Sequence, residues 1–104
     1  MSVVYEVNPS VERSIEKEFE KWLVGHINDV LSIEGFESAQ WYQVTSDAST
    51  HIEWKVDYTL RDQASLDDYL EKHAPKLRQP AKDKFGSHFT AHRRVLTPLK
   101  QYHK

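Results

Sequence analysis

The chain has 104 residues, which is the size of one domain with a single core. Hydrophobic residues make up 38% of it, and three Trp, five Tyr and four Phe make it too aromatic for a disordered chain. Fourteen Lys and Arg against sixteen Asp and Glu give a net charge of -2 with interspersed signs, which leaves no basic surface for nucleic acid.

The absence of cysteine excludes disulfides and thiolate chemistry. The N-terminal segment 1–7 contains Glu6 and lacks the basic and apolar regions of a signal peptide. No stretch approaches the roughly 18 apolar residues of a membrane-spanning helix. We therefore expect a soluble, cytoplasmic protein with neither a membrane nor a nucleic acid as partner.

Residues 2–7 alternate between apolar and other side chains with the period of a half-buried strand. Asn8-Pro9-Ser10 follows, and Pro9 has no N–H to donate to a strand ladder. Ser10 is a residue type that caps helix N-termini. The sequence therefore predicts that the strand ends at this tripeptide and that a helix starts near Ser10.

Helical spacing dominates the next segment. His26 falls within an apolar stripe, four residues after Trp22. Gly25 lies inside the pattern and costs about 1 kcal/mol relative to Ala in a helix interior. We therefore predict a kink, or a short second turn, over residues 26–31. The stripe consists of Ile15, Phe19, Trp22, Leu23, Ile27, Val30 and Leu31.

Two strands follow, over residues 36–45 and 51–60, joined by a polar connection of about five residues. In the first strand, Tyr42 shares a face with Gln40 and Val44, and Trp41 lies on the opposite face. The second strand alternates strictly between an apolar face and a charged one. The apolar face carries Ile52, Trp54, Val56, Tyr58 and Leu60.

A second amphipathic pattern begins at Ser65, a candidate N-cap. Proline breaks a helix interior but is tolerated in a first turn, so we predict a helix to about His73, a restart at Pro75 and an irregularity at Pro80. Phe85-Gly86 resembles a helix C-terminus, and residues 88–96 alternate as a last strand. Residues 98–104 are expected to fray.

The predicted order, β-α-β-β-α-β, is that of an α+β ferredoxin-like fold in which a four-stranded antiparallel sheet carries its helices on one face. We assign residues 1–104 to a single domain of this kind. The other sheet face is left uncovered, and we expect Trp41 and one face of the third strand to point outward there. A homodimer formed through the sheets would cover it.

Four runs carry a family resemblance: WLVGHINDVL, FESAQWYQV, LDDYLEKHAPKLR and KFGSHFTAHRRVL. Together with the Tyr-rich third strand they resemble a small bacterial family of unknown function in the dimeric α+β barrel superfamily, over nearly the whole chain. The resemblance implies a hydrophobic pocket between sheet and helices and dimerisation through the sheets. Other branches include cofactor-independent monooxygenases, stress-responsive barrel proteins, and polyketide cyclases or isomerases, so it implies fold more firmly than activity.

His26 is the candidate catalytic residue. A histidine on a buried stripe beside an indole can act as a general acid or base, because burial and neighbours tune its pKa. The alternative is a core histidine hydrogen-bonded to a carbonyl, which is the more common arrangement.

Candidate ligand-binding residues are aromatic side chains that could enclose a flat molecule, and Arg78, whose guanidinium could hold an anion near the Pro75 break. The alternatives are that the aromatic rings only fill the core and that Arg78 pairs with a carboxylate. The aromatic candidates are Trp22, Tyr42, Trp54 and Tyr58.

We predict no metal and no cofactor. His88 and His92 share a strand face but stand about 13 Å apart, too far to bind one ion together. The three glycines are isolated, so there is no phosphate-binding loop. The residue pattern does not decide which of His51, His73, His88 and His92 have a functional role.

The favoured function is binding of a small apolar or aromatic molecule between sheet and helices. If the protein is an enzyme, we expect cofactor-free proton transfer of a monooxygenase, isomerase or cyclase type. The alternative is a non-enzymatic homodimeric structural or regulatory module with no ligand.

Overall fold

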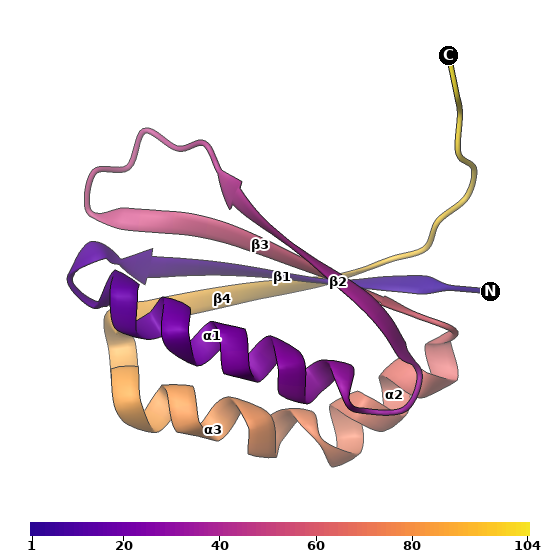
Figure 1. Cartoon of the computed structure of the whole chain (residues 1–104), viewed down its shortest axis with the longest axis horizontal. Helices are drawn as coiled ribbons and strands as arrows, with labels where there is room; N and C mark the ends of the chain where they lie inside the picture. Colours follow the sequence, from indigo (N-terminus) through magenta and orange to yellow (C-terminus); the bar gives the residue numbers. More distant parts are fainter.

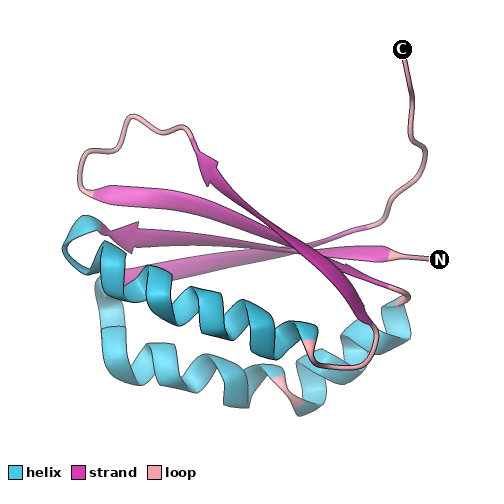
Figure 2. Ribbon diagram, in the orientation of Figure 1, coloured by secondary structure: helices cyan, strands magenta, loops and turns pink.

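The computed structural model describes all 104 residues and has the predicted ferredoxin-like fold, with the second helical region divided into two helices (Figures 1 and 2). The sheet order is β2-β3-β1-β4, and every neighbouring pair is antiparallel. The strands are β1 (Val3–Glu12), β2 (Phe36–Val44), β3 (His51–Leu60) and β4 (Phe89–Leu96), and the helices are α1 (Glu16–Leu31), α2 (Gln63–Lys72) and α3 (Ala74–Phe85).

All three helices lie on one side of the sheet, as predicted (Figure 1). Sixteen buried hydrophobic residues form the core between the two layers. Phe19 of α1 is at its centre, with its ring centroid 5.1 Å from that of Phe85 and 4.8 Å from that of Phe89. The core therefore ties α1 to the last helix and the last strand.

The predicted end of β1 is wrong. The strand continues through Asn8-Pro9-Ser10 to Glu12. Its pairing with β3 is interrupted at Asn8 and Pro9 and resumes at Ser10. Pro9 still pairs with Ala91 of β4, so the missing N–H interrupts one ladder but not the strand. Ser10 caps no helix, because its hydroxyl donates to Glu53 Oε1 at 2.6 Å. A short 3₁₀ turn, Arg13–Ile15, leads into α1 instead.

The predicted kink in α1 is also wrong. The helix runs without a break from Glu16 to Leu31. Gly25 is exposed, and a Cβ atom added there would meet nothing within 4 Å. The packing of Phe19, Leu23 and Val30 against the sheet holds the helix through this weak position.

The division between α2 and α3 confirms the predicted break near His73 and Pro75. The N-cap of α2 is Asp62, whose carboxylate accepts from the Ser65 N–H at 2.8 Å, so the prediction of a Ser65 cap is wrong by three residues. Pro80 lies inside α3, and the helix continues past it to Phe85. A 3₁₀ turn, Gly86–His88, then leads into β4.

The sheet face away from the helices, here called the outer face, is polar rather than aromatic. Glu6 on this face is only 1% exposed, and it accepts from Arg94 Nε at 2.7 Å and from Asn8 Nδ2 at 2.9 Å. Trp41 points to the helix side, where its ring meets Trp54 edge-on at 5.2 Å. The expectation that Trp41 faces outward is therefore wrong.

None of the helices has the length and apolar character that a membrane-spanning helix needs.

Candidate functional site

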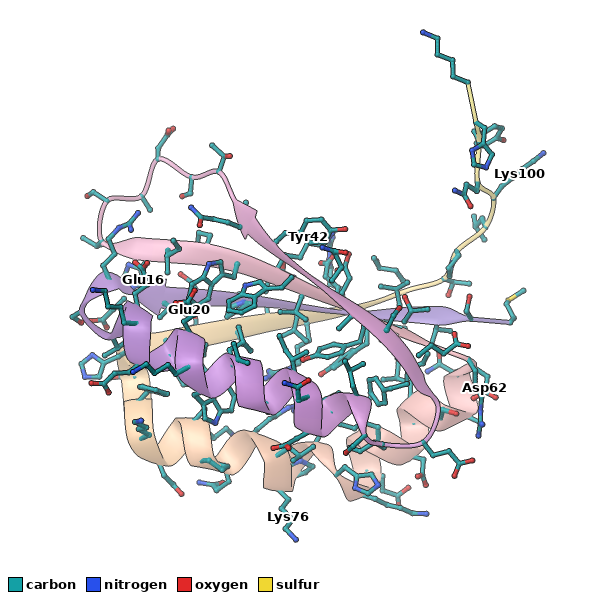
Figure 3. All side chains as sticks on the ribbon, in the orientation of Figure 1. Glu16, Glu20, Tyr42, Asp62, Lys76 and Lys100 are labelled. Atoms are coloured by element: carbon teal, nitrogen blue, oxygen red, sulfur yellow. The ribbon has the colours of Figure 1, made fainter.

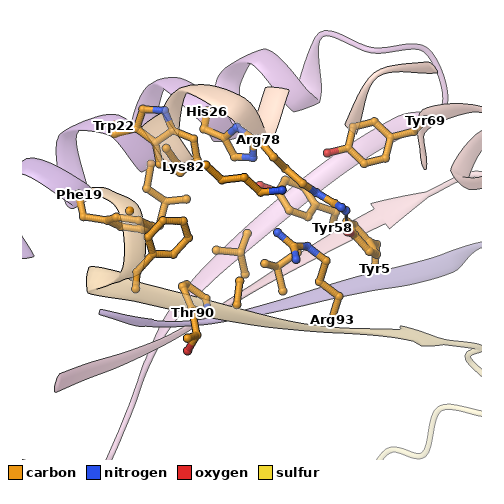
Figure 4. A pocket seen from close by; sticks show the side chains of 18 residues that line it. Tyr5, Phe19, Trp22, His26, Tyr58, Tyr69, Arg78, Lys82, Thr90 and Arg93 are labelled. Carbon is orange, nitrogen blue, oxygen red and sulfur yellow. Dashed lines mark hydrogen bonds between the residues drawn. The ribbon is translucent and has the colours of Figure 1, made fainter. Parts of the chain in front are cut away.

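A cavity of about 390 Å³ lies between α1, α3 and the helix side of the sheet (Figure 4). Its size is within the range of small-molecule sites, roughly 300–1,000 Å³. Eighteen residues line it, and eleven of them are hydrophobic. On the sheet side, the first and last strands border the cavity with side chains of small and medium size, including Val7, Pro9 and Ala91.

The helix wall of the cavity is formed by a stacked pair of rings. Trp22 and His26 lie one turn apart on α1, with ring centroids 4.5 Å apart and planes inclined by 20°. Figure 4 shows both rings bordering the open space. Burial, opposed by the carboxylate of Asp29 and reinforced by the charges of Arg93 and Arg78, lowers the pKa of His26 to about 4. His26 is therefore a neutral imidazole at pH 7.

Three tyrosines form the opposite end. The ring centroid of Tyr5 lies 6.2 Å from that of Tyr58 and 6.0 Å from that of Tyr69. Burial raises the pKa of Tyr58 well above its ordinary value and that of Tyr69 to about 12, so both hydroxyls stay protonated at neutral pH. They can donate hydrogen bonds to a ligand, and they supply no negative charge.

Cations complete the lining. Arg78 and Lys82 project from α3 and Arg93 from β4, and no aspartate or glutamate is among the lining residues. One guanidinium nitrogen of Arg78 donates to the Tyr5 hydroxyl at 2.6 Å. Burial, followed by the charge of Arg78, lowers the pKa of Arg93. Figure 4 shows the two guanidinium groups facing the same part of the cavity.

The structure brings four of the six sequence-predicted site residues together at this cavity: Trp22, His26, Tyr58 and Arg78. Arg78 has no carboxylate within salt-bridge distance, so within the chain it does not form the carboxylate pair that was the alternative to ligand binding. Their roles in binding or catalysis remain predictions.

The other two residues lie elsewhere. Tyr42 is 47% exposed on the outer face, where it is paired with Lys55 of β3 and points away from the helices (Figure 3). Trp54 is on the helix side but packs against Trp41 and Phe19 in the core. Alternation separates Trp41 and Tyr42 correctly onto opposite faces of β2, but it does not tell which face turns towards the helices, and the predicted assignment was the reverse of the observed one.

Sequence reasoning missed Arg93 and Lys82 as site residues. Arg93 had a signal: it shares its strand face with Phe89 and Ala91, and a charged residue on an apolar face is unusual. Lys82 follows Arg78 by four residues and therefore shares its helix face. Both cations are visible as site residues only when α3 is placed beside β4.

No group of three or more His, Cys, Asp or Glu side chains is arranged to hold a metal ion. The histidines at 51, 73, 88 and 92 are not among the lining residues of the cavity. His88 Nδ1 lies 3.2 Å from Glu12 Oε1, and His51 Nδ1 lies 2.8 Å from the Thr50 hydroxyl. The first contact joins the 3₁₀ turn before β4 to the end of β1, and the second is local, between neighbours in the chain.

The fold and the cavity define a ferredoxin-like α+β protein with a ligand-sized space between its helices and its sheet. Residues 2–99 match the family model described as a domain of unknown function, DUF4286. The chain belongs to this family, which confirms the resemblance seen in the sequence. No curated protein matches the chain by sequence.

Solved structures share the fold at low sequence identity. A variant of SnoaB, described as a cofactor-independent oxygenase from Streptomyces nogalater, is 15% identical with a TM-score of 0.71, over 95% of each chain. A protein from Deinococcus radiodurans, provisionally assigned to the antibiotic biosynthesis monooxygenases, is 11% identical with a TM-score of 0.73, over 98% of this chain and 97% of that one.

The de novo designed protein Foldit4 is 17% identical with a TM-score of 0.63, over 95% of this chain and all of that one. A designed protein and a described oxygenase thus share this architecture. The likeness therefore establishes the fold alone, and any activity has to be argued from the cavity.

Proposed function

We propose that the cavity binds a small, flat, largely apolar molecule. The observation that carries this proposal is a space of about 390 Å³ lined mainly by hydrophobic and aromatic side chains, with a few polar groups directed into it. A core filled only for stability would not leave a space of this size, because interiors are close-packed. Trp22 and Tyr58 stand at different sides of the cavity, where their faces can stack on a ligand ring.

We further propose that His26 acts as an acid or base on the bound molecule, without a cofactor. A neutral imidazole can accept a proton, and its low pKa makes it a weak base until a bound negative charge raises that pKa. The fold shared with a described cofactor-independent oxygenase supports this class of reaction. An isomerase or cyclase reaction would also begin with such a proton transfer.

Thermal unfolding in the presence of a panel of aromatic compounds tests the binding proposal, because a ligand that binds only the folded state raises the melting temperature. Hits are then assayed for product formation and oxygen consumption with no cofactor added. We expect His26→Gln to retain binding and to reduce turnover by roughly 10²-fold or more, as removal of a general base does. His92→Gln, on an exposed residue outside the cavity, is the matched control.

If no compound of the panel raises the melting temperature of the protein, the binding proposal is wrong and the non-enzymatic module is favoured. If instead His26→Gln binds and turns over ligand like the unchanged protein, His26 is not the acid or base.

We also propose, as expected from the sequence, that two copies pair through their outer faces and that the protein is cytoplasmic. The helices leave this sheet face uncovered, and it carries two exposed apolar side chains, Tyr42 and Val44. The oligomeric test is given below.

A further inference from the structure

The cavity holds positive charge that the protein does not neutralise. The chain has five arginines, and three of them pair with carboxylates: Arg13 with Glu16, Arg61 with Glu34, and Arg94 with Glu6. The remaining two, Arg78 and Arg93, are the arginines of the cavity, and no salt bridge includes them.

The two arginines are like charges that no acidic side chain of the cavity lining separates. Arg78 and Arg93 come from different elements, α3 and β4, and their guanidinium groups face the same space (Figure 4). Arg78 is half-buried and Arg93 is exposed to solvent, so solvent weakens their mutual repulsion but leaves the field of the cavity positive. Lys82 adds a third positive charge at the rim, while His26 and the hydroxyls of Tyr58 and Tyr69 are neutral at pH 7.

The donors are also incompletely used. A guanidinium has five N–H donors in a planar fork, and Arg78 donates one of them to the Tyr5 hydroxyl. Its other N–H groups are available to a ligand. The bond to Tyr5 fixes the direction of the Arg78 fork, because Tyr5 is itself buried between two other tyrosine rings. Planar forks of this kind match the geometry of a carboxylate or another delocalised oxygen anion.

From this juxtaposition we propose that the ligand is an aromatic molecule with one anionic oxygen group, held by Arg78 and Arg93, with its ring against the apolar wall that contains Trp22. The inference rests on the proposed ligand-binding function and deepens it by naming the chemical class. An aromatic carboxylate and an ionised phenol share this chemistry, and the two are separated by the choice of probes.

The test uses isothermal titration at pH 7 with two ligands of one shape and different charge, and with a third, anionic ligand of another class. The probes are 2-naphthoate, its neutral analogue 2-naphthamide, and 2,4-dinitrophenolate as the ionised phenol. We expect at least one of the two anions to bind about tenfold or more tightly than the amide, since hydrogen bonds between charged partners are about twice as strong as neutral ones.

Variants locate the anion. Arg93→Gln should weaken binding of the preferred anion by roughly tenfold and leave amide binding unchanged, and Arg78→Gln should do the same. Arg61→Gln, at an arginine far from the cavity lining, should change neither. Thermal unfolding of the free variants shows that each is folded, and loss of a like-charge contact predicts no decrease in melting temperature for Arg93→Gln.

A second readout follows the histidine. The charged groups that act on His26 are Asp29, Arg93 and Arg78, so an anion between the arginines should raise the pKa of His26 as measured by NMR. Amide binding without anion preference, or Arg93→Gln with unchanged anion affinity, would overturn the assignment of the ligand class and leave the binding proposal standing. Binding of none of the three probes, with none of the aromatic panel binding either, would overturn both.

Discussion

His26 makes the stability of the protein depend on pH in a predictable direction. Its pKa is about 4 in the folded protein and 6.5 as the ordinary value, so the unfolded chain binds the proton more readily between these values. Stability is therefore unaffected above pH 6.5 and falls as the pH decreases towards 4. The shift corresponds to at most about 3 kcal/mol, and partial exposure of the ring reduces it.

Urea denaturation at pH 7 and pH 5 measures this effect above the range in which Glu6 titrates. We expect His26→Gln to flatten the difference between the two pH values and His92→Gln to preserve it. If His26→Gln and the unchanged protein lose the same stability between pH 7 and pH 5, the pKa of His26 is not lowered by burial.

Glu6 gives a dependence of the same direction in a more acidic range. The hydrogen bonds from Arg94 and Asn8 lower its pKa from 4.5 to about 2, against the effect of burial. The ionised carboxylate thus contributes stability that is present above pH 4.5 and is lost as the pH falls through 2. We expect Glu6→Gln to remove this acid-dependent loss and to destabilise the protein at pH 7 by roughly 1–3 kcal/mol, because Arg94 and Lys55 lose a buried partner.

Circular dichroism during acid titration and urea denaturation at pH 7 provide the two measurements. Glu18→Gln, on an exposed residue of α1, should match the unchanged protein in both. An acid midpoint that Glu6→Gln does not move would contradict the role of the carboxylate.

At the level of single residues, sequence reasoning found what one element alone determines. Trp22 and His26 are adjacent because of helical spacing on α1, and the apolar stripe identified the side that faces the sheet. Arg93 was missed because its role depends on Arg78, which lies fifteen positions earlier in the chain on another element. Such pairings arise from topology, which local spacing does not contain.

At the level of elements, two glycines differ in whether the structure requires the residue to be glycine. Gly35, in the turn between α1 and β2, has φ of 95°, and an added Cβ would clash with the Ser65 side chain at the start of α2. Gly25 is inside α1 with open space around it. We expect Gly35→Ala to destabilise the protein by about 1–3 kcal/mol and Gly25→Ala to stabilise it by about 0.5–1 kcal/mol.

Chemical denaturation of the two variants and the unchanged protein at pH 7 gives both values. The pair is matched, because each variant adds one methyl group to a glycine. A stability gain for Gly35→Ala would show that α2 can shift away from the turn without loss, contrary to the close contact in the structure.

The strands and helix breaks show why the fold was largely predictable. Strict alternation fixed β3 with its correct bounds, and Pro75 located the division between α2 and α3. The prediction misplaces the end of β1 because the missing N–H of Pro9 affects pairing with one neighbouring strand only, and the strand continues through it. Its partner across the second ladder, Ala91, comes from the other end of the chain, so the sheet context overrode the local signal.

At the scale of the whole molecule, the structure changes the grounds for the proposed dimer. Trp41 is used in the helix-side core, so the outer face lacks the aromatic surface that the sequence suggested. It instead carries the buried Glu6 with its cationic partners, and the exposed side chains of Tyr42 and Val44 on β2. An outer-face dimer would therefore bury these two residues beside charged groups, among them Asp57, whose buried Oδ1 has no hydrogen-bond partner within the chain.

Multi-angle light scattering at micromolar concentration should give twice the 12.2 kDa chain mass. Tyr42→Arg should shift the population to monomer, because it places a charge beside Lys55, whose ammonium lies 5.5 Å from the Tyr42 ring centroid, in a surface that must be desolvated. Val24→Arg, at a valine that is 49% exposed on α1, adds the same charge to the opposite layer and should leave the dimer intact. A monomer for the unchanged protein would refute pairing through the outer face, and a dimer for Tyr42→Arg would place the interface away from β2.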